Sequence, residues 1–266
     1  MIRFILVVLL LLGFLISSVP LLIGTTQVGK KDPMRQQRHS LQVVQAMFRM
    51  ILRISGVRLK VKGLDRIPEG AVLYVGNHRS YFDILVGYTT VPGLLGFVAK
   101  KEMESWPLLA QWMRAVNCLF LDREDLKAGL KTILEGIEKV KSGISIWIFP
   151  EGTRNRDEDV LEMLPFKEGS LKIAEKSGCP VVPVAITGTS EIFERHLPFI
   201  RPGKVTIEYG EPFYIKDLPP EQRKRAGAYA RLRIIDMLKK EQQERKEQQE
   251  RKEEKYGFAG MQKRAG

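Results

Sequence analysis

Between residues 57 and 210 the sequence alternates short apolar runs with segments of helical spacing. The apolar runs are bounded by turn residues and are rich in β-branched and aromatic side chains, which is typical of buried strands. Seven such runs are VRLKVKG (57–63), AVLYVG (71–76), LLGFVAK (94–100), NCLFLD (117–122), ISIWIF (144–149), VVPVAITG (181–188) and KVTIEYG (204–210). Helical spacing appears between them at 126–142 and 166–177. The alternation predicts an α/β fold, with a central, mostly buried sheet of about seven strands flanked by helices.

The N-terminal residues 1–28 contain an uncharged run of 21 residues from Phe4 to Gly24. At about 1.5 Å per residue, a helix of this length would span a hydrocarbon core of ~30 Å. One base, Arg3, precedes the run, and Pro20 is expected to kink or end the helix. Several bases follow the run, namely Lys30, Lys31, Arg35 and Arg38. We therefore expect a transmembrane anchor in the cell membrane, with the rest of the chain on the cytoplasmic side. The alternative is a cleaved signal peptide, whose apolar region is normally shorter and ends in small residues.

Residues 29–56 are expected to form an amphipathic helix. Its apolar positions recur at helical spacing and comprise Leu41, Val44, Met47, Phe48, Ile51 and Ile54. Gln42, Gln45, Arg49 and Arg53 fall on the other side. Such a stripe commonly faces a protein core, but a helix next to an anchor could also lie in the lipid interface. Both alternatives stay open from the sequence.

After the domain at 57–218, the composition changes at Pro219 and Pro220. The segment 219–266 is rich in helix formers, and EQQERK occurs at 241–246 and again at 247–252. No sustained apolar heptad runs through this repeat, so a coiled coil is not expected. The pattern predicts a charged tail that is either a solvated helix or disordered.

The net charge of +12 and the pI near 9.7 indicate an anionic partner, either nucleic acid or a membrane surface. The basic residues are dispersed and no DNA-binding motif appears, so a nucleic-acid partner is not expected. The chain has two cysteines, and its histidines, His39, His78 and His196, are far apart. We expect neither a metal site nor a bound cofactor, because no Cys/His group has ligand spacing.

A first candidate site follows the strand AVLYV, where His78 is followed by Asp83. If a helix begins just after His78, the Asp83 carboxylate can reach back to the imidazole Nδ1. That contact fixes the tautomer and leaves Nε2 free to take a proton from a hydroxyl. A structural hydrogen bond between the two side chains is the alternative.

Other polar residues are expected at neighbouring strand ends. The segment Phe149–Arg154 reads FPEGTR, in which Gly152 allows close backbone approach, Thr153 offers a hydroxyl and Arg154 suits a phosphate. Glu151 is unexpected in an anion site and could hold a substrate hydroxyl or orient an arginine. Arg123 in FLDR and Lys100 in FVAK add cations at two further strand ends. The set predicts chemistry on a phosphorylated hydroxyl compound, and the absence of a Walker A loop or GxGxxG disfavours a nucleotide.

Together and in order, NHRSYFD (77–83), FLDR (120–123), FPEGTR (149–154) and VPVAI (182–186) resemble the four motif blocks of the glycerolipid acyltransferases. The resemblance is to the 1-acylglycerol-3-phosphate acyltransferase family and covers residues from about 70 to 190. Supporting matches are Val98–Lys100 before the second block and Leu164–Lys167 with Gly169 after the third. A departure is Asn117, where family members often have glycine.

The resemblance implies transfer of a fatty acyl group from a thioester to the free sn-2 hydroxyl of lysophosphatidic acid, giving phosphatidic acid. It implies His78 as the general base and Asp83 as its orienter, with no acyl-enzyme. It assigns the acceptor phosphate to Lys100, Arg123 and the loop of Glu151, Gly152, Thr153 and Arg154. Implied partners are membrane lipid, a lysophospholipid acceptor, and acyl-CoA or acyl carrier protein as donor. Another acceptor, such as glycerol 3-phosphate, or a non-catalytic membrane-tethered adaptor are the alternatives.

Overall fold

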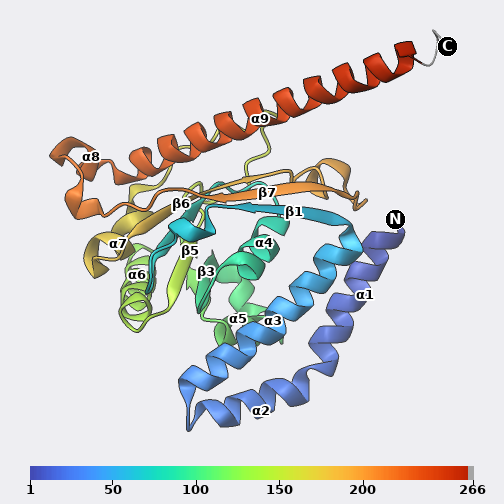
Figure 1. Cartoon of the computed structure of the whole chain (residues 1–266). Coiled ribbons are helices and arrows are strands. Elements are labelled where there is room, and N and C mark those ends of the chain that lie inside the picture. The colour runs from blue at the N-terminus through green and yellow to red at the C-terminus, as the bar shows by residue number, and fades with distance from the viewer. Residues whose placement is uncertain (263–266) are drawn as a thin grey trace.

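Seven strands form one mixed sheet in the order β1-β7-β6-β2-β5-β3-β4 (Figure 1). The computed structural model describes the backbone of residues 1–262 and the side chains of residues 1–251. The strands are β1 (Val57–Lys62), β2 (Leu73–Gly76), β3 (Leu95–Lys100), β4 (Leu119–Leu121), β5 (Ser145–Ile148), β6 (Val181–Thr187) and β7 (Gly203–Tyr209). All neighbours pair in parallel except β6 and β7, which are antiparallel. The predicted α/β class and all seven strands are confirmed.

The central strands are buried on both faces, as their apolar runs predict. In β2 and β5, Tyr74 and Trp147 point to one core, and Val75 and Ile146 point to the other. None of these four side chains is more than 1% exposed. Because side chains alternate along a strand, each run supplies both cores at once.

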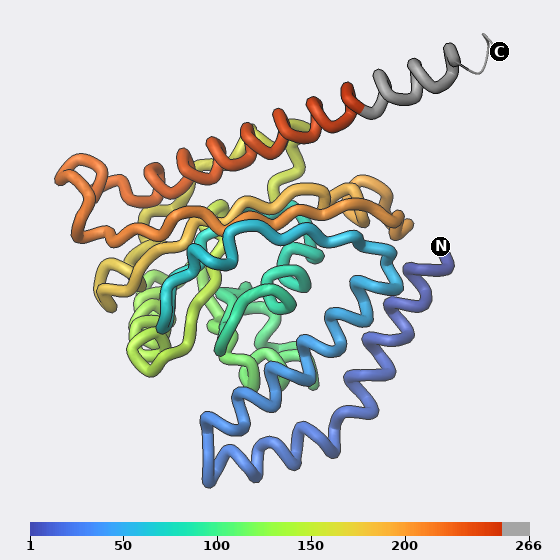
Figure 2. Tube along the Cα trace, viewed as in Figure 1, coloured from blue at the N-terminus to red at the C-terminus, as the bar shows by residue number. Residues whose placement is uncertain are grey.

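Helices cover both faces of the sheet. One face is covered by α3 (Pro33–Ser55), α4 (Phe82–Thr90) and α5 (Leu109–Ala115). The other is covered by α6 (Leu126–Lys141), α7 (Lys172–Ser177) and α9 (Ala226–Gln262), with the short α8 (Pro220–Lys224) leading into α9. The segment predicted as a helix at 166–177 is a 3-10 turn at Glu168–Leu171 followed by α7. The chain trace in Figure 2 places the N-terminal helices and α9 on opposite sides of the sheet.

The N-terminal apolar run is bent near Pro20, where the sequence predicts a kink, so it forms two helices in place of one continuous helix. The run forms α1 (Ile2–Ser17) and α2 (Val19–Gly29), whose axes differ by 50°. Pro20 lies in the first turn of α2, where its missing N–H is tolerated but cannot continue the hydrogen bonding of α1. Among the described residues, no single helix has the length and apolarity to cross a membrane, whereas the bent pair taken together does.

The stripe of α3 faces the protein core, which decides between the two alternatives for this helix. Leu41, Val44, Met47 and Ile51 are buried in the same core as Tyr74. The Gln45 side chain donates to the Tyr88 carbonyl of α4 at 2.8 Å, which fixes α3 on that helix.

The charged C-terminal segment forms α8 and α9 as far as residue 262, and its first part belongs to the domain; residues 263–266 of the predicted tail lie outside the described residues. Ala226, Ala230, Ile234 and Leu238 recur every four residues of α9 and are buried against the sheet. Glu241 follows on the same face, where its carboxylate accepts from Lys62, Thr206 and Arg245. The helical layer therefore continues past the boundary at residue 218 that the sequence suggests.

Candidate active site

The predicted site residues follow the carboxyl ends of parallel strands. β2, β5, β3 and β4 run in one direction, so the segments that leave them start at the same edge of the sheet. His78 follows β2, Lys100 ends β3, Arg123 follows β4 and the loop Glu151–Arg154 follows β5. Ligands of open α/β sheets collect at this edge.

His78 and Asp83 are in direct contact. The His78 Nδ1 lies 2.8 Å from Asp83 Oδ2, and the His78 side chain is 15% exposed. Asp83 stands in the first turn of α4, which brings its carboxylate back toward the end of β2. Because an ionised carboxylate only accepts hydrogen bonds, Nδ1 carries the proton and Nε2 is the nitrogen able to accept one.

The Asp83 carboxylate is buried and receives four donors. Oδ2 accepts from the Nδ1 of His78 and from the backbone N–H groups of Arg79 (2.7 Å) and Ser80 (2.8 Å). Oδ1 accepts from the Thr189 hydroxyl at 2.6 Å. These donors stabilise the charged carboxylate and leave it one orientation.

The position of His78 is fixed by its ring and by its backbone. The imidazole stacks on the Phe149 ring with centroids 4.0 Å apart. The His78 N–H donates to Glu151 Oε1 at 2.9 Å, and the His78 carbonyl accepts from the Asn155 N–H at 2.7 Å. The loop after β5 therefore holds the histidine from both sides.

Glu151, for which the sequence suggests holding a substrate hydroxyl or orienting an arginine, accepts hydrogen bonds from two backbone segments. Its Oε1 accepts from the His78 backbone and its Oε2 accepts from the Leu164 N–H at 3.0 Å. The side chain is buried, and this burial raises the pKa of Glu151 above its ordinary value. Both oxygens are used to join the His78 loop to the segment at Leu164.

Cations converge on Gly152. The Arg123 guanidinium donates to the Gly152 carbonyl. A Cβ at Gly152 would lie 3.3 Å from the Lys167 Nζ and 3.7 Å from an Arg123 nitrogen. Gly152 has a φ of +76°, which favours glycine, and the missing side chain leaves room between these cations.

The other predicted site residues, Arg154, Thr153 and Lys100, form no hydrogen bond with the His78–Asp83 pair in the described part of the chain. Arg154 lies over the Tyr81 ring and pairs with Glu194 at 3.4 Å. Thr153 and Lys100 are exposed at the same edge. The structure thus brings His78, Asp83 and Glu151 into one cluster, with Arg123 and Gly152 in another.

Comparisons with known proteins find acyltransferases. A sequence model described as Acyltransferase matches residues 58–187, which include His78, Asp83 and the loop after β5. The crystal structure of the 1-acyl-sn-glycerophosphate (LPA) acyltransferase PlsC from Thermotoga maritima superposes with a TM-score of 0.71 at 27% identity. That match covers 90% of this chain and 97% of the other.

Two curated 1-acyl-sn-glycerol-3-phosphate acyltransferases are also similar. The Saccharomyces cerevisiae protein is 29% identical over 89% of this chain and 77% of its own length. The Limnanthes douglasii protein is 32% identical over 63% of this chain, and the match spans 59% of that relative. In sequence and fold the chain is similar to the 1-acylglycerol-3-phosphate acyltransferases over most of its length.

The departure from the family pattern at Asn117 has a backbone explanation. Asn117 has a φ of +63°, a conformation that glycine adopts freely and asparagine tolerates better than most residues. Its carbonyl lies 2.0 Å from where a Cβ of Gly96 would be, so the two backbones pack closely. Asn117 therefore occupies a position whose backbone conformation favours glycine.

Sequence reasoning missed Thr189 and Glu194 in this acyltransferase. Both follow β6, whose VPVAI block reads simply as a core strand. Thr189 donates to the Asp83 carboxylate of α4, and Glu194 accepts from the Tyr81 N–H. The signal in the sequence is that the polar Thr189 comes two residues after the end of an apolar run; the position of that strand beside β2 comes from the structure alone.

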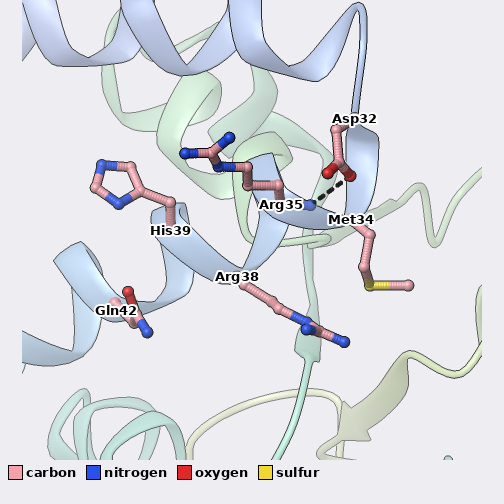
Figure 3. A pocket seen from close by; sticks show the side chains of 6 residues that line it. All are labelled: Asp32, Met34, Arg35, Arg38, His39 and Gln42. Carbon is pink, nitrogen blue, oxygen red and sulfur yellow. Dashed lines mark hydrogen bonds between the residues drawn. The ribbon is translucent and has the colours of Figure 1, made fainter.

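Among the described residues, no group of three or more His, Cys, Asp or Glu side chains could hold a metal ion. A pocket at the start of α3 is lined by Asp32, Met34, Arg35, Arg38, His39 and Gln42 (Figure 3). Asp32 caps α3 there by accepting from the Arg35 N–H at 2.9 Å, and none of the predicted site residues lines this pocket.

Proposed function

We propose that this acyltransferase moves a fatty acyl group from an acyl thioester to the free sn-2 hydroxyl of lysophosphatidic acid, forming phosphatidic acid. The observation that carries the proposal is the His78–Asp83 contact at the carboxyl edge of the sheet, with Nε2 able to accept a proton. The names of the similar proteins support the choice of acceptor.

In the proposed reaction, His78 is the general base and Asp83 its orienter. The acceptor hydroxyl gives its proton to Nε2 as its oxygen attacks the thioester carbonyl. The C–S bond then breaks, and the imidazolium returns the proton to the departing thiol. No acyl-enzyme forms, and acid–base help of this kind contributes ~10²–10⁴ in rate.

Lys100, Arg123 and Arg154 are proposed to bind the acceptor's phosphate. Gly152 and Thr153 belong to the same loop after β5 as Arg154 and are proposed to line the phosphate site. Glu151, also in this loop, is proposed to act by holding the His78 backbone in place. The donor is an acyl-CoA or acyl carrier protein thioester, and we propose no metal and no bound cofactor.

The bent helix pair is proposed to bind the cell membrane from the cytoplasmic side. One side of α1 packs on the core through residues such as Phe14, whose ring centroid lies 5.3 Å from that of Trp112. The other side exposes large apolar residues, among them Ile2, Leu9 and Ile16 in α1 and Ile23 in α2. Apolar patches of this kind mark membrane or protein contacts, and a lipid acceptor needs access from the bilayer.

The test is mass-spectrometric product analysis with the purified full chain in lipid nanodiscs. Both donors are offered with lysophosphatidic acid, other lysophospholipids and glycerol 3-phosphate. The expected product is phosphatidic acid, with at least a 100-fold loss in His78→Ala and none in His39→Ala, an exposed histidine of α3. Transfer to a different acceptor would replace the substrate, and transfer independent of His78 would refute the mechanism.

A further inference from the structure

The Arg154 guanidinium is held by two side chains from other segments. Its central carbon lies 3.8 Å from the centroid of the Tyr81 ring, and its Nη1 lies 3.4 Å from Glu194 Oε1. Tyr81 comes from the loop between His78 and α4, and Glu194 from the 3-10 turn after β6. Arg154 is therefore the meeting point of three segments of the candidate active site.

Glu194 aligns both partners through one oxygen. Its Oε1 also accepts from the Tyr81 backbone N–H at 2.8 Å, so the same atom places the aromatic ring and the guanidinium. Its Oε2 is buried and has no hydrogen-bond partner in the part of the chain that the structure describes. Burial also raises the pKa of Glu194.

This arrangement differs from an ion pair that uses the full guanidinium fork. Arginine and a carboxylate commonly join through two parallel hydrogen bonds, whereas Arg154 meets a single oxygen. Most of its five N–H donors are thus left for another acceptor. Arg154 is also two residues from Gly152, where Arg123 and Lys167 converge. A ligand with several anionic oxygens matches these donors.

We propose that Glu194 is a positioning residue for acceptor binding. With Tyr81 it holds the Arg154 guanidinium in the orientation in which its remaining N–H groups bind the acceptor's phosphate. A long side chain that is already ordered loses less entropy when the ligand binds, so the restraint raises affinity. This inference rests on the proposed function, because it takes Arg154 as a contact of the acceptor phosphate.

The test compares Glu194→Ala with Glu194→Gln in the full chain. Glu194→Ala is expected to raise the KM for lysophosphatidic acid about 10-fold. This is the size expected for the loss of alignment of one charge-assisted hydrogen bond. The kcat at saturation and the KM for the donor should stay within about twofold. Glutamine keeps an accepting oxygen and should restore most of the affinity. Glu191→Ala, an exposed glutamate on the same segment that pairs with Arg195 at 3.8 Å, is the matched control.

Two readouts separate positioning from a merely structural role. In the first, Glu194→Ala added to Arg154→Ala should cause no further rise in KM, since its effect passes through the arginine. In the second, binding of lysophosphatidic acid to nanodisc-embedded protein is compared with binding of monoacylglycerol, which lacks the phosphate. Only the former should weaken in Glu194→Ala.

The outcomes also distinguish this inference from the proposed function. If the wild type forms no phosphatidic acid, the proposed function fails. The inference then stands only if Glu194→Ala selectively weakens lysophosphatidic acid binding. Equal losses with both lipids, a fall in kcat alone, or additive effects with Arg154→Ala would overturn it.

Discussion

Replacing Asp83 by asparagine isolates the charge of the orienting carboxylate from its hydrogen bonds. The asparagine oxygen can take the place of Oδ2, which accepts from His78, Arg79 and Ser80. Its NH₂ group then faces the Thr189 hydroxyl, which in the wild type donates to Oδ1 at 2.6 Å. A hydroxyl rotates freely and can accept as well as donate, so all four contacts can be kept.

The expected loss follows from the distance between the two charges. When His78 takes the substrate proton, its imidazolium lies against Asp83, with Nδ1 2.8 Å from Oδ2. Two unit charges centred about 4 Å apart interact by about 4 kcal/mol at an effective dielectric constant of 20. The proton is only partly transferred in the transition state, so about 3 to 4 kcal/mol is lost. That loss corresponds to a fall in kcat of about 10²–10³-fold.

The assay is kcat for phosphatidic acid formation, with thermal unfolding of the same preparations. Asp83→Asn should unfold within a few degrees of the wild type, whereas Asp83→Ala should be much less stable because it leaves buried N–H donors without an acceptor. Activity of a folded Asp83→Asn protein within threefold of the wild type would refute the orienting role. Equal destabilisation by both variants would refute the isosteric reasoning.

Three further substitutions test other parts of the structure. Thr189→Val removes one donor from the orienting carboxylate and is expected to lower kcat about 10-fold, whereas Thr189→Ser should restore it. For Glu241, burial opposes ionisation, but hydrogen bonds from Lys62, Arg245 and Thr206 outweigh it and lower the pKa from 4.5 to about 2. Glu241→Gln should therefore reduce the free energy of unfolding by about 2 to 3 kcal/mol at pH 7. Because the folded-state pKa is lowered, this difference should shrink as the pH falls from 4.5 toward 2, which denaturant titrations at pH 7 and pH 3 would show. Gly96→Ala places a Cβ 2.0 Å from a backbone oxygen and should cost about 3 kcal/mol, whereas Gly24→Ala, with open space around it, should be neutral in the same thermal unfolding assay.

The strands could be predicted from sequence because each is a local apolar run, but their order and direction could not. The strand β1 begins the domain yet lies at an edge, paired in parallel with β7, the last strand. Both run opposite to the other five, through the antiparallel pairing of β6 with β7. Strand order depends on contacts between distant segments, and no local pattern records them.

The bend between the N-terminal helices also depends on a contact between distant segments. Hydropathy predicts the apolar character of the run from Phe4 to Gly24 but carries no information about its shape. The bend at Ser18 goes with a tertiary contact, since the Trp112 indole N–H donates to the Ser18 hydroxyl at 3.0 Å. Trp112 comes from α5, and three strands separate it from Ser18 along the chain, so hydropathy alone could not reveal this partner.

The candidate active site combines a locally encoded pair with support that only the topology supplies. His78 and Asp83 are five residues apart, and one helix start is enough to join them, so their spacing predicts the contact. Thr189 and Glu194 lie more than 100 residues further along the chain and arrive beside this pair because β6 is the neighbour of β2. Asn77 fastens the two strand ends together, since its side chain exchanges two hydrogen bonds with the Ile186 backbone. The VPVAI block thus contributes to the site through the residues that follow it. A substitution in β6 that shifts its register with β2 should therefore lower activity even where the histidine and its aspartate are untouched.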